Sequence, residues 1–195
     1  SMALPGLLKP SFDQLNIALD LLQKCIEEDR RILIVGDFDA DGATASVVAI
    51  KALRLMGAKY VDFLVPNRFK HGYGLSPEIV NEAKLEKEPN LIITVDNGIS
   101  SNEGAALARS LDIDVIITDH HLPPKELPDA NAIINPNLRG CDFPSKNLAG
   151  VGVCFYLFSS LKTHLDSIGY FEKNNIKVPD LRVLLDLVAL GTVAD

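Results

Sequence analysis

Three aspartates at alternate positions follow the first strongly apolar stretch of the chain. Residues 32–35 are typical of a buried strand, and Asp37, Asp39 and Asp41 come directly after it, before Gly42. Carboxylates packed this closely raise one another's pKa unless a cation shares them. Their oxygen atoms suit Mg²⁺, Mn²⁺ or Ca²⁺ better than zinc. The pattern therefore predicts a site for a hard divalent cation at the end of a strand.

Other kinds of protein carry a similar pattern. An EF-hand loop begins with the same spacing, but it needs a glutamate at its twelfth position, where this chain has Val48, and it follows a helix rather than a strand. An Asp-nucleophile phosphatase also carries D-x-D after a strand, and at this point it stays open. Capping of the next helix explains one of the three aspartates well and all three poorly.

Two later apolar stretches also end in side chains that can bind a metal or move a proton. Residues 91–95 precede Asp96, and residues 115–118 lead, one residue later, to His120 and His121. In an open parallel sheet, ligands bind beyond the carboxyl ends of the strands. A single histidine is usually structural, but two adjacent histidines after a buried strand favour a functional site.

A loop after the second predicted strand gathers cations in an otherwise acidic chain. This segment, residues 66–77, contains Arg68, Lys70, His71 and Tyr73. An ordinary solvated surface loop would explain the cluster equally well. The functional alternative is a binding site for a phosphate or nucleotide, with Arg68 as a bidentate donor to phosphate and Tyr73 stacked on a base.

Predicted strands and helices alternate along the chain. Apolar runs predict strands at 32–35, 60–65, 91–95, 115–118 and 132–135. Helical spacing, caps and stops predict helices at 11–29, 43–56, from 76 onward, and at 102–111, 148–165 and 181–190, with a polar connection at 168–179. We therefore expect an α/β fold, a doubly wound sheet of about five parallel strands with helices on both faces. Gly150 and Gly152, at the start of one helix, serve either close packing, the favoured interpretation, or phosphate binding.

Length and composition limit the kinds of protein that this chain can be. Its 195 residues suffice for one substantial domain, and 47% of them are hydrophobic, without an apolar run of about 18 residues or a signal peptide. We therefore expect a cytoplasmic protein that is not attached to a membrane. The three cysteines, Cys25, Cys141 and Cys154, argue against a disulfide framework or a cysteine zinc site. A net charge of −7 excludes a surface that is basic throughout but allows a local basic cleft or a cation-loaded acidic one.

Four motifs occur in a fixed order: DFDADG at 37–42, VDNG at 95–98, TDHH at 118–121 and GTVAD at 191–195. In this order they resemble the signature of the DHH phosphoesterase superfamily. The sequence of residues 66–74, with PNR and GYG, is most similar to that of the RecJ branch, which consists of exonucleases specific for single-stranded DNA. The resemblance covers the chain from about residue 31 to its last residue. It also removes the Asp-nucleophile phosphatase from the alternatives.

The resemblance implies an enzyme that degrades single-stranded DNA in the 5′ to 3′ direction to mononucleotides, using two Mn²⁺ or Mg²⁺ ions. Such a pair of ions activates water and stabilises the charge on the phosphoryl group. The resemblance also implies the metal ligands: Asp37 and Asp39 for one ion, Asp41, His120 and Asp195 for the other, and a bridging Asp96. His121 is expected beside the reacting phosphate, so that His121 and Asp96 are the catalytic residues and Arg68, Tyr73 and His121 contact the substrate.

We expect the whole chain, 1–195, to be one DHH catalytic domain. Residues 1–30 form its leading segment and helix, 31–147 its metal-site core, and 148–195 its closing helices. RecJ-like enzymes continue into a second, substrate-binding domain, which we expect to be absent here, so that the fragment alone is weak or inactive. Single-stranded DNA is the expected partner, a monomer is favoured, and DNA repair and recombination are the implied processes.

Two other functions stay open at this point. A DHH phosphoesterase for small substrates, such as pyrophosphate, a cyclic dinucleotide or a short oligonucleotide, would share every metal ligand. A non-catalytic DHH-like binding module would share the fold, although four intact motifs speak against it.

Overall fold

The structure, a computed structural model, describes residues 11–138 and 148–195. Cys141 and most of the loop predicted at 137–147 therefore lie outside the described residues, as do the first ten residues of the leading segment.

Five parallel strands form one sheet, in the order β2-β1-β3-β4-β5. They are β1 (Arg31–Gly36), β2 (Tyr60–Leu64), β3 (Leu91–Val95), β4 (Asp114–Thr118) and β5 (Ala132–Ile134). Strand β3 is buried along its whole length, as is β1 after its first residue. Continuous apolar strands of this kind are typical of a parallel sheet with both faces covered. The predicted parallel sheet is thus confirmed, with each strand within one or two residues of its expected bounds.

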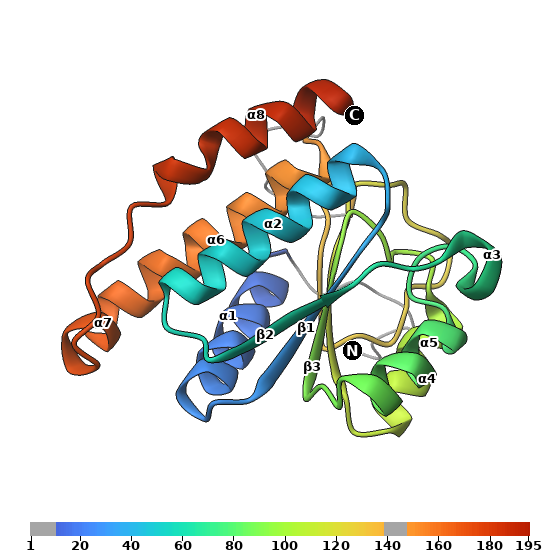
Figure 1. Cartoon of the computed structure of the whole chain (residues 1–195), viewed down its shortest axis with the longest axis horizontal. Coiled ribbons are helices and arrows are strands. Elements are labelled where there is room, and N and C mark those ends of the chain that lie inside the picture. The colour runs from blue at the N-terminus through green and yellow to red at the C-terminus, as the bar shows by residue number, and fades with distance from the viewer. Residues whose placement is uncertain (1–10, 139–147) are drawn as a thin grey trace, which may run out of the picture.

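Helices cover both faces of the sheet (Figure 1). The helices of one face are α1 (Ser11–Glu27), α2 (Ala40–Leu55) and α6 (Gly150–Ser167), and those of the other face are α4 (Pro77–Glu86) and α5 (Asn102–Ser110). Alternation along β1 supplies both cores: Ile32 and Ile34 pack toward the first face, and Leu33 and Val35 toward the second. The predicted doubly wound α/β fold is confirmed.

A further helix, α8 (Leu185–Ala194), lies over α2 and α6 as an outer layer (Figure 1). A short 3₁₀ helix, η1 (Leu181–Leu184), leads into it. The sequence predicted a helix that ends at residue 190, but the helix continues through the fourth motif to Ala194. This continuation carries the last residue, Asp195, to the carboxyl edge of the sheet.

Three local differences from the predicted elements have physical causes. Helix α2 begins at Ala40, three residues early, because the Asp39 carboxylate accepts a hydrogen bond from the Gly42 N–H at 2.7 Å and caps the helix. The connection after α6 contains a short helix, α7 (Tyr170–Lys173), whose buried Tyr170 hydroxyl donates to the backbone carbonyl of Met56 at the end of α2. The loop after β2 contains another, α3 (Arg68–His71), capped by the residue before it.

The strand order reverses between β1 and β3, so the crevice beyond their carboxyl ends is the place where ligands bind in folds of this type. Asn97 joins the two strand ends, because its side-chain NH₂ group donates to the carbonyls of Val35 at 2.9 Å and Val95 at 3.0 Å. The acidic residues that follow β1 and β3 therefore meet at a fixed spacing.

The cysteines and the helices exclude two further kinds of site within the described part of the chain. Cys25 and Cys154 are buried and unpaired, and burial raises the pKa of the Cys25 thiol to about 11, so both serve as packing residues. None of the described helices combines the length and the apolar character that crossing a bilayer requires.

We predict that Gly104→Ala lowers the free energy of unfolding by about 2 kcal/mol. Gly104 lies in the first turn of α5, where an added Cβ would come within 1.7 Å of the Leu75 carbonyl oxygen. Gly152→Ala is the matched control, because its Cβ would meet only the flexible Leu148 side chain, at 3.1 Å. Urea unfolding followed by circular dichroism measures both, and the control should be unchanged or slightly stabilised. An equal loss in the two variants would contradict the steric argument.

Candidate metal centre

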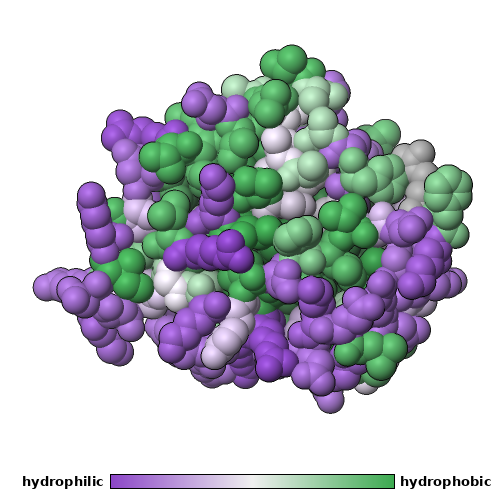
Figure 2. All heavy atoms as spheres, viewed as in Figure 1, coloured by the Kyte–Doolittle hydropathy of each residue, from purple (hydrophilic) through white to green (hydrophobic). Residues whose placement is uncertain are grey.

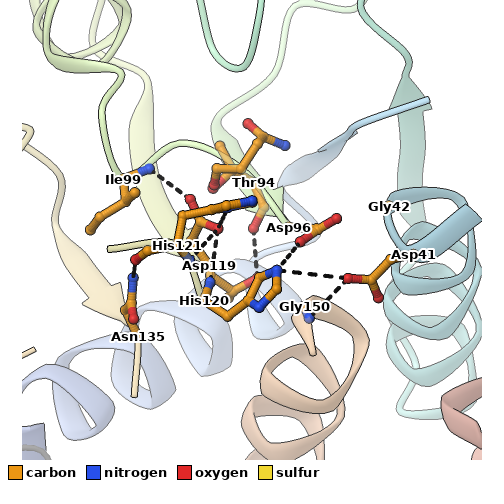
Figure 3. Close-up of polar contacts among 12 residues, drawn as sticks. Asp41, Gly42, Thr94, Asp96, Ile99, Asp119, His120, His121, Asn135 and Gly150 are labelled. Atoms are coloured by element: carbon orange, nitrogen blue, oxygen red, sulfur yellow. Dashed lines mark hydrogen bonds and ion pairs between the residues drawn. The ribbon is translucent and has the colours of Figure 1, made fainter. Parts of the chain in front are cut away.

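The backbone at Asp96 is set in an uncommon conformation that aims its side chain. Its φ is +62°, in the left-handed region, which aspartate and asparagine tolerate better than most residues. The turn is closed by a hydrogen bond of 2.8 Å from the Thr94 hydroxyl to the Asn97 carbonyl, and by Gly98 at φ +105°. The Asp96 carboxylate consequently points toward the histidines that follow β4 (Figure 3).

His120 lies where side chains from four elements converge. Its Nε2 atom is 2.9 Å from Oδ1 of Asp96, 3.7 Å from Oδ1 of Asp195 and 3.9 Å from Oδ2 of Asp41. Figure 3 shows Asp41, from α2, and Asp96, from the end of β3, pointing toward the same ring nitrogen. The structure therefore brings together four of the predicted metal ligands, although they lie far apart in the sequence.

There are two groups of described residues in which the ligand atoms all lie within 4.8 Å of one another, close enough to bind one ion. The first group is Asp41, His120 and Asp195, and the second is Asp96, Asp119, His120 and His121. The first group, with Asp96 beside it, is the set expected for the second ion.

Asp37 and Asp39 belong to neither group of described residues. The exposed Asp39 carboxylate caps α2, and the buried Asp37 carboxylate accepts a hydrogen bond of 2.8 Å from the Phe38 N–H. The structure thus places the ligands expected for the first ion near the end of β1 but engaged with backbone N–H groups.

The start of α6 binds the Asp41 carboxylate. The N–H groups of Gly150 and Val151 donate to the two carboxylate oxygens of Asp41, at 3.0 and 3.1 Å. A Cβ on Gly150 would lie 2.3 Å from Oδ1 of Asp96, so only glycine fits between the two acidic side chains. The glycine at this helix start serves close packing, and its N–H binds a carboxylate of the protein itself. Sequence reasoning did not find this contact.

The electrostatics of the cluster fit a divalent cation. Burial raises the pKa of Asp96 to about 7 and also raises that of Asp41, while contact with Asp96 raises the pKa of His120. Oδ1 of Asp96 is buried but not aligned for a hydrogen bond with His120, and it has no other hydrogen-bond partner among the described residues. Crowded carboxylates, one of them with a buried oxygen that accepts no hydrogen bond, form an acceptor set that a cation satisfies.

Asp119 orients His121 and is the residue to which sequence reasoning gave no role. Its Oδ1 atom lies 2.6 Å from Nδ1 of His121 and accepts from the His120 N–H at 2.8 Å, and its Oδ2 accepts from the Ile99 N–H at 3.0 Å. Burial alone would raise the pKa of Asp119, but the hydrogen bonds from His121 and Ile99 outweigh it and lower the pKa. The bond to Asp119 in turn raises the pKa of His121 to about 9. Its position, directly after a buried strand and before two histidines, was the available signal.

A cavity of about 760 Å³ adjoins His121 on the side of α4 and α5. Tyr73 stands at its border, with its ring edge-on to that of His121 and the ring centroids 6.5 Å apart. Burial and nearby carboxylates, including Asp37 and Asp119, raise the pKa of Tyr73, so its hydroxyl stays protonated. Arg68 begins α3, but its side chain lies outside the described part of the structure.

His71 anchors the loop that carries Tyr73. It is buried, its Nδ1 accepts a hydrogen bond of 2.8 Å from the Asn67 N–H, and its Nε2 contacts the carboxylate of Glu82 in α4. This histidine therefore fastens α3 to α4 and stands apart from the metal centre.

Comparison with known proteins assigns the chain to a family. The family model described as the DHH family, N-terminal domain, matches residues 31–192. This chain belongs to the DHH family. The resemblance predicted from the four motifs is confirmed.

Among proteins of the family, the chain is 58% identical over 178 residues to the single-stranded-DNA-specific exonuclease RecJ of Escherichia coli (strain K12). The alignment covers 91% of this chain and 31% of that protein, so the chain spans about a third of the relative's length. A crystal structure of exonuclease RecJ bound to manganese matches with a TM-score of 0.76 and 32% identity, covering 100% of this chain and 45% of that one. RecJ from Thermus thermophilus in complex with Mn²⁺ matches with a TM-score of 0.72 and 30% identity, covering 98% of this chain and 25% of that one.

We predict that Asp119→Asn lowers the pKa of His121 from about 9 toward the ordinary value of about 6.5, because the charged partner of the imidazolium is lost. NMR titration of the protein in EDTA measures this, with the His121 signal assigned from its loss in His121→Gln. Because the folded-state pKa is raised, the stability that protonated His121 contributes is full below about pH 6.5 and is lost as the pH rises through about 9. Urea unfolding of the wild type should therefore show a loss of stability across this interval that the variant lacks. The same His121 midpoint in both proteins would contradict the assignment.

Proposed function

We propose that this chain is the catalytic domain of a RecJ-like, metal-dependent phosphodiesterase that degrades single-stranded DNA in the 5′ to 3′ direction to mononucleotides. The observation that supports this most directly is the convergence of Asp41, Asp96 and Asp195 on His120 at the point where the strand order reverses. The similarity to exonucleases named for single-stranded DNA supports the substrate class.

We assign two divalent cations, Mn²⁺ or Mg²⁺, to this centre. Asp41, His120 and Asp195 would hold one ion, Asp37 and Asp39 would hold the other, and Asp96 would be a ligand of both. RecJ structures named for Mn²⁺ and Mg²⁺ support the choice of ions, as do the hard carboxylate oxygens. When bound, such a pair supplies Lewis acidity that activates water and offsets the charge on the phosphoryl oxygens.

The chain's own residues would bind and orient the scissile phosphate. With a pKa of about 9, His121 is protonated at neutral pH and can donate a hydrogen bond to a phosphoryl oxygen, while Asp119 keeps its ring in place. Tyr73, at the border of the cavity, would stack on a base. Arg68 would bind a second phosphate as a bidentate donor.

We also propose that residues 1–195 form one domain and that a second, substrate-binding domain covers part of its surface. Helix α8 is apolar nearly all round, yet Leu190 is 59% exposed and Val193 86% exposed. Figure 2 shows hydrophobic residues gathered over α8 and α2, whereas polar residues dominate the lower rim of the same face. Apolar helices of this kind are normally covered. We expect a substrate-binding domain on this surface to raise the activity above that of residues 1–195 alone.

The expected setting of the activity rests on the family resemblance. We infer that the protein is a monomer that acts in the cytoplasm, in DNA repair and recombination. Its partner would be single-stranded DNA, bound in a groove to which the second domain contributes.

We expect the chain at high concentration to release mononucleotides from a 5′-labelled single strand with Mn²⁺, but not from a duplex, and not in EDTA. Asp96→Asn should remove tight Mn²⁺ binding and lower the cleavage rate more than about 100-fold, because it takes a charged ligand from both ions. Asparagine also tolerates the left-handed backbone at this position, so the fold is kept. Calorimetric titration with Mn²⁺ measures the binding.

Asp62→Asn is the control, because Asp62 is an exposed aspartate paired with Lys87 at 2.9 Å, on the edge strand β2. Wild-type affinity for Mn²⁺ in Asp96→Asn would refute the bridging assignment. A preference for a dinucleotide over the long strand would favour a small-substrate phosphoesterase, and neither Mn²⁺ binding nor cleavage would favour a binding module.

A second prediction concerns the cavity beside His121. Tyr73→Ala should raise KM for single-stranded DNA about tenfold with a smaller change in kcat, because stacking on a base contributes about 1–3 kcal/mol. Tyr73→Phe keeps the ring and should stay close to the wild type. Tyr60→Ala, an exposed tyrosine on β2, is the matched control. Steady-state kinetics with an unstructured oligonucleotide tests this, and an equal KM in Tyr73→Ala and the wild type would remove Tyr73 from the substrate site.

A further inference from the structure

Helix α8 packs against α2 and α6 through the half-buried Leu187 and Val188 and through a buried glycine, Gly191. Gly191 is the one fully buried residue of α8, whereas residues before and after it are exposed or half-buried. A Cβ at this position would lie 2.7 Å from Oγ1 of Thr44 in α2, and 2.7 Å from Cγ1 and 3.1 Å from Cβ of Val151 in α6. The backbone of α8 therefore approaches both helices more closely than any side chain would allow.

Neither neighbour can easily move aside. The Thr44 hydroxyl donates to the backbone carbonyls of Ala40 and Asp41, which fixes its rotamer. Val151 is β-branched, and such a side chain has essentially one rotamer in a helix. A methyl group at residue 191 would consequently displace α8 itself rather than its neighbours.

Gly191 and the metal centre are joined by short, rigid contacts. The N–H of Asp195 donates to the Gly191 carbonyl at 3.1 Å, so the carboxylate that reaches His120 lies one helical turn beyond the glycine. On the other side of the contact, Val151 donates its N–H to Asp41. Val151, which Gly191 faces, is thus one of the two residues whose N–H groups bind the Asp41 carboxylate, and Thr44 donates to the Asp41 backbone carbonyl.

We propose that Gly191 is a positioning residue for the metal centre. The missing side chain lets α8 come close enough to α2 and α6 for Asp195 to meet His120 and Asp41, and this approach sets the affinity of the centre for a divalent cation. The inference rests on the proposed metal-dependent function and deepens it by assigning the reach of Asp195 to one steric contact.

A double-mutant cycle separates positioning from general packing. Mn²⁺ affinity is measured by calorimetric titration for the wild type, Gly191→Ala, Asp195→Asn and the double variant. Urea unfolding in EDTA reports the packing cost of each change without the metal. We expect Gly191→Ala to weaken Mn²⁺ binding about tenfold or more, on the scale of residues that orient metal ligands. The double variant should bind no more weakly than Asp195→Asn, because the glycine acts through that carboxylate.

Two further variants complete the design. Val193→Ala, a change at an exposed position of the same helix between Gly191 and Asp195, should leave the affinity unchanged. Thr44→Ala and Val151→Ala together remove both side-chain atoms that lie at 2.7 Å. Added to Gly191→Ala, they should restore its Mn²⁺ affinity. This triple variant tests the steric contact even if Gly191→Ala alone does not fold.

Two results would overturn the proposal. One is wild-type affinity in Gly191→Ala or in Asp195→Asn, and the other is a double variant whose loss equals the product of the two single losses. If Asp96→Asn loses Mn²⁺ while Gly191→Ala keeps it, only this inference fails. If the wild type itself does not bind Mn²⁺, the proposed function fails with it.

Discussion

Mutual repulsion among the carboxylates that meet at His120 is the main physical constraint on this structure. Asp41, Asp96 and Asp195 all lie within 4 Å of one ring nitrogen of His120, and burial of Asp41 and Asp96 favours the neutral acid at these two positions. The protein offsets part of this charge with its own positive groups: the histidine, and the two N–H groups at the start of α6, where the helix dipole adds to the effect. The negative charge that these groups leave uncompensated favours the binding of a cation.

The rest of the fold holds these acids together against that repulsion. Asp96 sits in a left-handed backbone conformation, which costs free energy and persists only where the surroundings enforce it. Asn97 enforces it by joining the ends of β1 and β3, and Gly150 and Gly191 bring two helices in without a side chain between. Both glycine contacts are steric, so the spacing of the acids is set by packing, which is stiff, rather than by their own electrostatics.

The sequence predicted the elements well because their signals are local. Each strand of the sheet is an apolar run, and β1 and β3 read as buried because both faces of a parallel sheet are covered. The start of α2 was misplaced because a side chain, Asp39, provided a cap that apolar periodicity does not reveal. The contact of Gly150 with Asp41 joins residues 109 positions apart, so no window of the sequence contains it. The predicted strand ends indicated that Asp96 and His120 lie at the same edge of the sheet, but only the family motifs indicated that Asp195 belongs with them.

The same reasoning accounts for a strongly acidic protein that is proposed to act on a polyanion. A net charge of −7 would repel DNA if it were spread evenly, yet part of it is concentrated in the acidic cluster around His120, which divalent cations would neutralise. Binding of cations there would change the local field from repulsive to attractive at the point where a phosphate must approach His121. The acidic centre is thus compatible with a nucleic-acid substrate because its charge is matched to ions, while the loop that carries Arg68 and Tyr73 is proposed to contact the substrate directly.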